Sequence, residues 1–428
     1  MSFLNKGIIM VNGVRLVAGS SVSAKWQVVL LWALAIGLFI QISGMVWMVS
    51  GSARNTQIYL WLLLPALIFS VCAVLSRSRV RLEIQYLPWV AFLVWGALSS
   101  IWASNSETSP LSFAKRGLFI ALFLLAVFLL MDRGEALLRR ALLAGILLVS
   151  LGALATLVYQ FGWLDRPLSY RAFRVDRLGI GEFANYRYPV AAGIFHGAIA
   201  IWVFGVTIGQ RTSLRKALFW FLAFVVLVLY VLLTYARGAW IGLGVGCFVA
   251  VLLQNSRRGW WVLGLCSIVV VVATVVWWEH LLNELFKRQL SGRGPIWDYY
   301  FAVMREHWTF GYGLGTPFNY DWPDGKTSSP HAHSLYLQQI YDSGLVSIVM
   351  LGTGLFGVCY KAWCCRSNPW VRLAFPALVY ALIVMLTDVE RIFTRPGSYW
   401  TVFWLPVAIL LAVKTRSKEF ALDSSSRG

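Results

Sequence analysis

Two of the chain's five histidines, His331 and His333, lie in a polar stretch immediately before an apolar run that begins at Leu335. Imidazole titrates near neutrality, and a helix N-terminus or neighbouring arginines would lower its pKa and keep it neutral. A neutral histidine can take a proton from a hydroxyl group. A His-x-His pair can also bind a metal ion, but no Cys, Asp or Glu beside it completes a ligand set. We therefore expect a general base here rather than a metal site.

Two arginines stand where a membrane-spanning helix is expected to begin. Arg187 precedes Pro189, and proline suits the first turn of a helix, whose N-terminus beside an arginine favours an anion. Arg237 is the single charge in a short turn between two apolar runs, where an unpaired charge is costly and usually functional. The alternative for Arg237 is snorkelling to lipid headgroups. The other arginines of the loop 161–188 are expected to form local ion pairs in solvent.

Two further motifs admit more than one interpretation. Asp388 and Glu390 form Asp-x-Glu between the last two apolar runs, a pattern that binds a cation or pairs with Arg391 and Arg395. We favour the pairing. Residues 311–315 read Gly-x-Gly-x-Gly, but no strand precedes them in a βαβ setting, so the motif predicts a tight loop rather than a dinucleotide site.

Composition identifies the elements that must position these residues. Of 428 residues, 59% are hydrophobic and only 13% are charged, against roughly 25% charged in soluble domains. A helix needs about 20 apolar residues to cross a bilayer. The sequence thus predicts an all-α polytopic membrane protein with about 12 transmembrane helices. The predicted spans are 26–49, 57–76, 84–103, 112–131, 138–160, 189–209, 217–235, 239–254, 260–278, 337–360, 371–387 and 396–413.

The charges predict the orientation of the chain, which carries a net charge of +19. One set of connections, together with both termini, holds 21 of the 37 cations but only five of the 18 acids. By the positive-inside rule this set is cytoplasmic. We expect a cytoplasmic segment 1–25 that is not a cleaved signal peptide, a single transmembrane domain 26–413 and a cytoplasmic tail 414–428. The basic residues serve topology, and nucleic-acid binding is not expected.

Two long loops then lie on the outer face, at 161–188 and at 279–336, the second beginning with the amphipathic stretch 279–290. Loops of such length in a compact protein are usually functional. The histidines and most of the arginines discussed above belong to these loops or to the turns beside them. The chemistry is therefore expected at the outer membrane surface.

Four motifs occur in a characteristic order. They are Arg237 in Tyr-Ala-Arg-Gly-Ala-Trp, Arg293 in Ser-Gly-Arg-x-x-x-Trp, Phe310-Gly-x-Gly, and His333-Ser-Leu-Tyr-Leu-x-x-x-x-Asp342-x-Gly344. In this order the sequence resembles the O-antigen ligase family, within a superfamily of lipid-linked glycan transferases. The resemblance covers the twelve-span plan and, at the level of motifs, residues 185–345. Ser334 and Asp342 stand where the family usually has Asn and Glu.

The resemblance implies a GT-C-like glycosyltransferase of lipopolysaccharide biosynthesis in the bacterial inner membrane, with a periplasmic active site. The donor would be a polysaccharide on undecaprenyl pyrophosphate, and the acceptor lipid A–core oligosaccharide. Arg187, Arg237 and Arg293 would bind the pyrophosphate, and His333 would deprotonate the acceptor, giving inversion. Neither a cofactor nor a metal is expected. His331, Asp342 and Asp388 are secondary candidates.

The sequence is also compatible with three other functions. An O-antigen polymerase would use the same donor with a second lipid-linked glycan as acceptor. A protein O-oligosaccharyltransferase often carries additional periplasmic mass after its spans. A transporter of lipid-linked glycan belongs to a different class and would show ionisable residues within broken midplane helices. The ionisable residues here sit mainly in outer loops, which favours surface chemistry.

Overall fold

The computed structural model describes residues 8–11, 14–17, 24–75, 83–276, 278–282, 292–323, 325, 327–389 and 391–414. Most of the predicted cytoplasmic segments 1–25 and 414–428 lies outside the described residues. The same holds for Glu390, for residues 283–290 of the predicted amphipathic stretch, and for the arginines at positions 77, 79 and 81.

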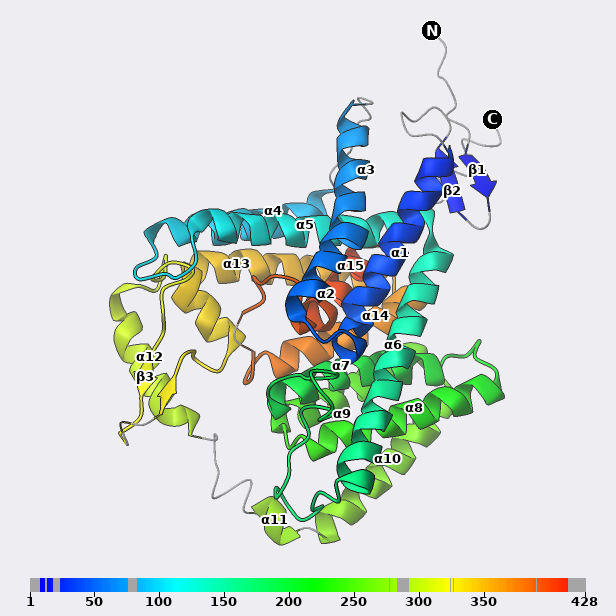
Figure 1. The fold of residues 1–428 in the computed structure, drawn as a ribbon, viewed down its shortest axis with the longest axis vertical. Coiled ribbons are helices and arrows are strands. Elements are labelled where there is room, and N and C mark those ends of the chain that lie inside the picture. Colours follow the sequence, from blue (N-terminus) through cyan, green and yellow to red (C-terminus); the bar gives the residue numbers. More distant parts are fainter. Residues whose placement is uncertain are drawn as a thin grey trace.

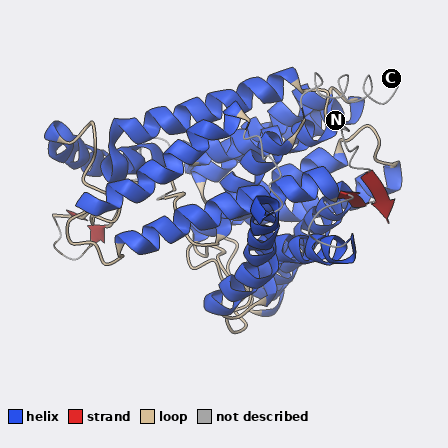
Figure 2. Ribbon diagram, turned by 90° about the horizontal axis from the view of Figure 1, so that it is seen from above, coloured by secondary structure: helices blue, strands red, loops and turns tan. Residues whose placement is uncertain are grey.

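The described chain is mainly helical, and its few strands lie at the periphery (Figure 2). Two ribbons of two strands each pair β1 (Ile8–Val11) with β2 (Val14–Val17) and β3 (Tyr320–Asp321) with β4 (Ser328–Ser329). The helices of the first half are α1 (Ala24–Trp47), α2 (Gly51–Ile58), η1 (Tyr59–Leu63), α3 (Leu64–Leu75), η2 (Ile84–Tyr86), α4 (Leu87–Ser99), η3 (Ser100–Trp102), α5 (Pro110–Arg133), α6 (Glu135–Leu157), η4 (Val158–Trp163) and α7 (Pro189–Thr207). Those of the second half are α8 (Leu214–Leu233), α9 (Arg237–Gln254), α10 (Arg257–Val276), α11 (Trp278–Leu282), α12 (Arg293–Val303), η6 (Met304–Glu306), α13 (Leu335–Cys364), α14 (Pro369–Val384), η7 (Trp400–Trp404) and α15 (Leu405–Ala412).

These helices account for the predicted membrane spans. Among the described residues, nine helices are long and apolar enough to cross a membrane, and Pro369–Val384 and Trp400–Ala412 are shorter apolar helices. Helix α10 covers the remaining predicted span at 260–278. The prediction of an all-α polytopic membrane protein is confirmed. The predicted helix starts at Pro189 and after Ser334 are also confirmed, because α7 begins at Pro189 and α13 at Leu335.

Helix α7 forms the centre of the bundle and packs against α8, α9 and α14. Almost every residue from Ala192 to Gly205 is buried, so this helix is covered by protein on all sides. Small residues permit the close approach. Gly197 lies against the Tyr380 ring, and the Tyr380 hydroxyl donates a hydrogen bond to the Ile194 carbonyl at 2.9 Å.

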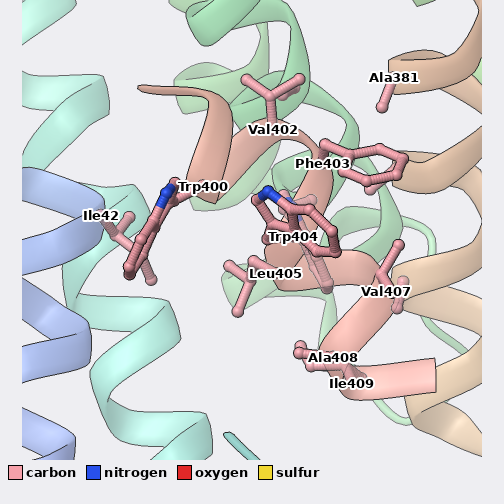
Figure 3. Packing of buried hydrophobic residues seen from close by; sticks show 14 of the residues in the cluster. Ile42, Ala381, Trp400, Val402, Phe403, Trp404, Leu405, Val407, Ala408 and Ile409 are labelled. Carbon is pink, nitrogen blue, oxygen red and sulfur yellow. The ribbon is translucent and has the colours of Figure 1, made fainter. Parts of the chain in front are cut away.

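A second buried region surrounds the chain from Trp400 to Ala412, where η7 and α15 are almost fully enclosed (Figure 3). Trp404 contacts Trp89 edge to face at 5.7 Å between ring centroids, and Trp400 packs on Phe123 at 5.0 Å. These contacts join the C-terminal helix to α4 and α5. Helices α4, α5 and α13 run side by side (Figure 1).

Two contacts bring together charged residues that the charge pattern assigns to the same side of the membrane. The Lys361 ammonium donates a hydrogen bond to the Leu411 carbonyl at 2.6 Å, and Lys414 pairs with Asp132 at 2.7 Å. All these residues belong to spans or connections assigned to the cytoplasmic side. We call the region of these contacts the basic end. The second long outer loop, which includes α12 and β3, lies away from it (left in Figure 1).

Candidate active site

His333 stands at the turn that leads into α13. Its φ is +51°, a left-handed conformation that is uncommon for a residue other than glycine. Ser334 then returns to an extended conformation as the N-cap of α13. The Leu335 amide donates a hydrogen bond to the Met385 carbonyl at 3.0 Å, which ties the start of α13 to the end of α14. The position of His333 is therefore set by two helices at once.

A buried hydrogen-bond network holds this turn against α13. The Ala332 amide donates to Gln338 Oε1 at 3.0 Å, and Gln338 Nε2 donates to Asp342 Oδ1 at 3.0 Å. Arg391 completes the network by pairing with Asp342 through Nε at 2.6 Å. Gln338 and Asp342 expose 0% and 1% of their surface, so the network is shielded from water. Asp342 thus acts on His333 through the backbone of the turn.

The surroundings of His333 keep its imidazole neutral. Burial, followed by the neighbouring His331 and Arg293, lowers the pKa of His333 to about 4. The two histidine rings lie 4.1 Å apart between centroids, and the His333 amide donates to His331 Nδ1 at 3.2 Å. At neutral pH His333 can therefore accept a proton.

Beside this turn lies a cationic cavity of about 510 Å³. Four arginines and one carboxylate line it, together with small and aromatic residues; the charged residues are Arg171, Arg174, Arg237, Arg293 and Asp388. They come from the first long outer loop, the start of α9, the start of α12 and the segment after α14. An excess of guanidinium groups in a partly enclosed cavity favours a ligand with more than one negative charge.

Two contacts hold these charges in place. Arg293 forms an ion pair with Asp388, whose other oxygen accepts a hydrogen bond from the Thr387 hydroxyl at 2.7 Å. Arg174 Nε donates to the Thr234 carbonyl at 2.8 Å, at the end of α8 and three residues before Arg237. Arg293 and Arg174 are therefore held by residues at or just beyond the ends of α14 and α8.

Two comparisons with known proteins show what the chain is similar to. A family model described as O-antigen ligase matches residues 222–352, which include Arg237, Arg293, His333 and Asp342. A curated protein named O-antigen ligase, from Pseudomonas aeruginosa, is 24% identical over 383 residues, covering 89% of this chain and 90% of that protein. The chain is therefore similar to O-antigen ligases over these residues and over most of the length of this relative. Its many apolar helices are those of a multi-pass membrane protein.

The structure brings together only some of the predicted site residues. Arg237 and Arg293 line the cavity, and His333 lies close enough to Arg293 to feel its charge. Arg187 is not among the lining residues; it is exposed and its charge acts instead on Arg54. Its contact with a pyrophosphate stays a prediction.

Sequence reasoning missed Arg171 and Arg174, which were expected to form ion pairs in solvent. The available signal was the excess of five arginines over three acids in their loop. The favoured pairing of Asp388 with Arg391 or Arg395 also needs correction. Asp388 pairs with Arg293, whereas Arg391 pairs with Asp342 on α13, so both take partners that lie far away in the sequence. Among the described residues, no three His, Cys, Asp or Glu side chains gather as a metal site.

Two glycines, Gly311 and Gly344, allow the outer loop to pack closely against a break in α13. Gly344 interrupts the helix with φ of 72° and ψ of 179°, and a Cβ atom there would overlap the Thr309 carbonyl. A Cβ on Gly311 would lie 2.6 Å from the Tyr341 carbonyl oxygen. Across this contact the Leu345 amide donates to the Trp308 carbonyl at 2.8 Å. The tight loop predicted at 311–315 is confirmed, since all three of its glycines have positive φ.

Proposed function

We propose that this protein transfers a polysaccharide from undecaprenyl pyrophosphate to a sugar hydroxyl of lipid A–core oligosaccharide, at the periplasmic face of the bacterial inner membrane. One observation carries the proposal: a histidine kept neutral by its surroundings stands beside a cavity lined by four arginines. The cavity has the chemistry that a departing pyrophosphate requires, and the histidine that of a base for a hydroxyl group.

In this proposal the cavity binds the pyrophosphate of the donor. When the glycosidic bond to the pyrophosphate breaks, the bonding electron pair goes to the pyrophosphate oxygen, whose negative charge increases. Arg237 and Arg293 stabilise that charge through paired N–H donors, and Arg171 and Arg174 extend the same cationic surface. Asp388 orients the Arg293 guanidinium. Arg187 is retained as a further predicted contact at the entry to α7.

The acceptor side of the reaction depends on His333. Its imidazole takes the proton of the acceptor hydroxyl while the hydroxyl oxygen forms a bond to the anomeric carbon of the donor sugar. Attack from the face opposite the pyrophosphate inverts the configuration at that carbon. The reaction balances with one glycosidic bond formed, one broken and one proton passed to His333. No nucleotide is needed, because the donor already carries an activated phosphate.

The proposed periplasmic location follows from the distribution of cations. Residues assigned to the cytoplasm by the positive-inside rule meet at the basic end, in contacts such as that of Lys414 with Asp132. The cavity and His333 belong to loops and helix ends assigned to the other side. The long outer loop that supplies Arg293 and His333 has a small core of its own, which includes Tyr300 and Phe318.

A reconstituted reaction tests the proposal and its nearest alternative, an O-antigen polymerase with the same donor. Purified protein is incubated in EDTA with undecaprenyl-pyrophosphate glycan, with and without lipid A–core. We expect polysaccharide-bearing lipid A–core that forms without added metal. Lengthening of the donor glycan instead would identify a polymerase, and no transfer to either acceptor would contradict both functions.

A further inference from the structure

A second group of arginines lies outside the cavity. Arg116 of α5 experiences the charges of Arg395 and Arg391, and the Tyr59 hydroxyl lies near enough to interact with Arg395 and Arg116. We call Arg116, Arg391 and Arg395 the second arginine cluster. None of the three is among the residues that line the cavity. The second cluster therefore requires an explanation separate from donor binding.

Close packing creates the second cluster. The Phe393 ring lies against two glycines, so that a Cβ on Gly117 of α5 would be 3.1 Å from its Cζ and a Cβ on Gly96 of α4 would be 2.9 Å from its Cε2. Gln41 Nε2 of α1 donates to the Gly397 carbonyl at 2.9 Å. The segment 391–397 is thus pressed onto α1, α4 and α5. Its two arginines flank Phe393 and are held beside Arg116.

The second cluster contains one ion pair and, among the described residues, one buried donor without an acceptor. Arg391 pairs with Asp342, a carboxylate that is only 1% exposed and is also bonded by Gln338. Arg116 Nε is buried and finds no hydrogen-bond acceptor among the described residues, while its guanidinium lies over the Phe113 ring at 4.6 Å. A buried donor without an acceptor is destabilising unless a ligand supplies one.

A chain of contacts connects the second cluster to the turn that carries His333. The segment 388–395 has Asp388 at the donor cavity and Arg391 on Asp342, and Asp342 is joined through Gln338 to the turn that carries His333. An anionic ligand at the second cluster would therefore contact the same segment whose Asp388 lines the cavity. Guanidinium groups recognise phosphate oxygens through paired N–H donors.

We propose that the second arginine cluster binds a phosphate group of the acceptor glycolipid and so orients its sugar hydroxyl toward His333. The assignment of the ligand to the acceptor rests on the proposed function. The assignment of an anion site rests on the buried Arg116 Nε and on the gathering of like charges. Lipid A is a phosphorylated glycolipid, so it offers the required group on a molecule that lies in the same membrane leaflet.

Binding measurements on full-length protein in phosphatidylcholine nanodiscs test this site. The probes are lipid A–core and the same glycolipid after removal of its phosphates. The variants are Arg116→Gln and Arg395→Gln, and the matched control is Lys115→Gln, which removes the same charge from an exposed neighbour on the same helix. We expect each arginine variant to weaken binding of phosphorylated acceptor by about 10-fold or more, as for loss of a charged hydrogen bond. The control should bind like wild type, and the KM for the donor should not change.

The dephosphorylated probe should bind wild type about as weakly as the phosphorylated probe binds the variants. Equal binding of the two probes by wild type, or equal behaviour of Arg116→Gln and Lys115→Gln, would overturn the site. Displacement of the acceptor by phosphatidylglycerol or by inorganic phosphate at matched concentration would overturn its assignment to the acceptor. Arg395 is exposed, so Arg395→Gln provides the test even if Arg116→Gln does not fold. Phosphate-dependent binding without any glycan transfer would support the site and refute only the proposed function.

Discussion

Arg391 donates hydrogen bonds to both carboxylate oxygens of Asp342, from Nε to Oδ2 at 2.6 Å and from Nη2 to Oδ1 at 3.0 Å. The pair joins the segment after α14 to α13, two parts of the chain 49 residues apart. Through Gln338 it also supports the turn that carries His333. This ion pair therefore contributes to stability and to the geometry of the base.

Replacement of Asp342 by Asn should destabilise the protein, because it leaves the Arg391 charge without its buried partner. Loss of one member of a buried ion pair costs about 3–5 kcal/mol, and we expect the lower figure because Arg391 is 22% exposed. Thermal unfolding in detergent measures the change. Asp298→Asn on α12, an exposed position, is the control. Unfolding of Asp342→Asn at the wild-type temperature would show that the pair contributes little.

The acidic limb of the pH profile should report His333. Protonation removes the base, so kcat/KM for the acceptor should be constant near neutrality and fall as the pH drops through about 4, the pKa of His333. Removal of a neighbouring imidazole by His331→Ala should raise this pKa, moving the limb upward. The limb should stay below the ordinary value of about 6.5, since burial is the largest cause of the shift. An unchanged limb in His331→Ala would contradict this electrostatic coupling.

Arg237→Lys should lose most of the transfer activity although the positive charge is kept. A lysine ammonium cannot form the paired, planar contacts that a guanidinium makes with a pyrophosphate. We expect a fall in kcat/KM for the donor of about 10-fold or more, the loss typical of a charged hydrogen bond. Arg305→Lys, at an exposed position of η6, should be neutral. Full activity of Arg237→Lys would show that Arg237 serves only membrane topology and makes no essential contact with the pyrophosphate.

Gly344→Ala should unfold at a lower temperature than wild type because the break in α13 needs a positive φ and direct contact with Thr309. Alanine at such a conformation costs more than about 1 kcal/mol before the steric overlap is counted. Gly352→Ala in the same helix meets nothing within 4 Å and should be neutral or slightly stabilising. Similar unfolding temperatures for the two variants would mean that the break tolerates a side chain.

The sequence predicted the helices well because apolar length and helix-start residues act locally. Pro189 and the stretch before Leu335 mark their helix starts without any knowledge of the tertiary fold. Arg237 and Arg293 were identified from motifs whose order follows the chain. The contacts between distant segments were not predictable in this way. Nothing local distinguishes Arg174 from its loop neighbours, and its bond to Thr234 depends on how the first outer loop crosses the end of α8.

The ion-pair partner of Asp388 could not be predicted from the sequence either, because it also lies far away along the chain. Asp388 lies near Arg391 in the sequence, so we expected these two residues to pair. In the folded protein Asp388 pairs instead with Arg293, which is 95 residues away. The break in α13 at Gly344 was also not predicted, because it falls inside a single predicted span, 337–360. Its cause is a backbone contact with residues 308–312, which sequence spacing does not reveal.

Single-turnover transfer by His333→Ala tests whether His333 is the general base of the reaction. The measurement compares this variant with wild type and with His307→Ala, an exposed histidine of the same outer loop. Removal of a general base typically lowers the rate by about 10²–10⁴-fold, and donor affinity should be unchanged because the arginines are intact. We expect this loss in His333→Ala and wild-type rates in His307→Ala. Transfer by His333→Ala at the wild-type rate would contradict the assignment of His333 as the base.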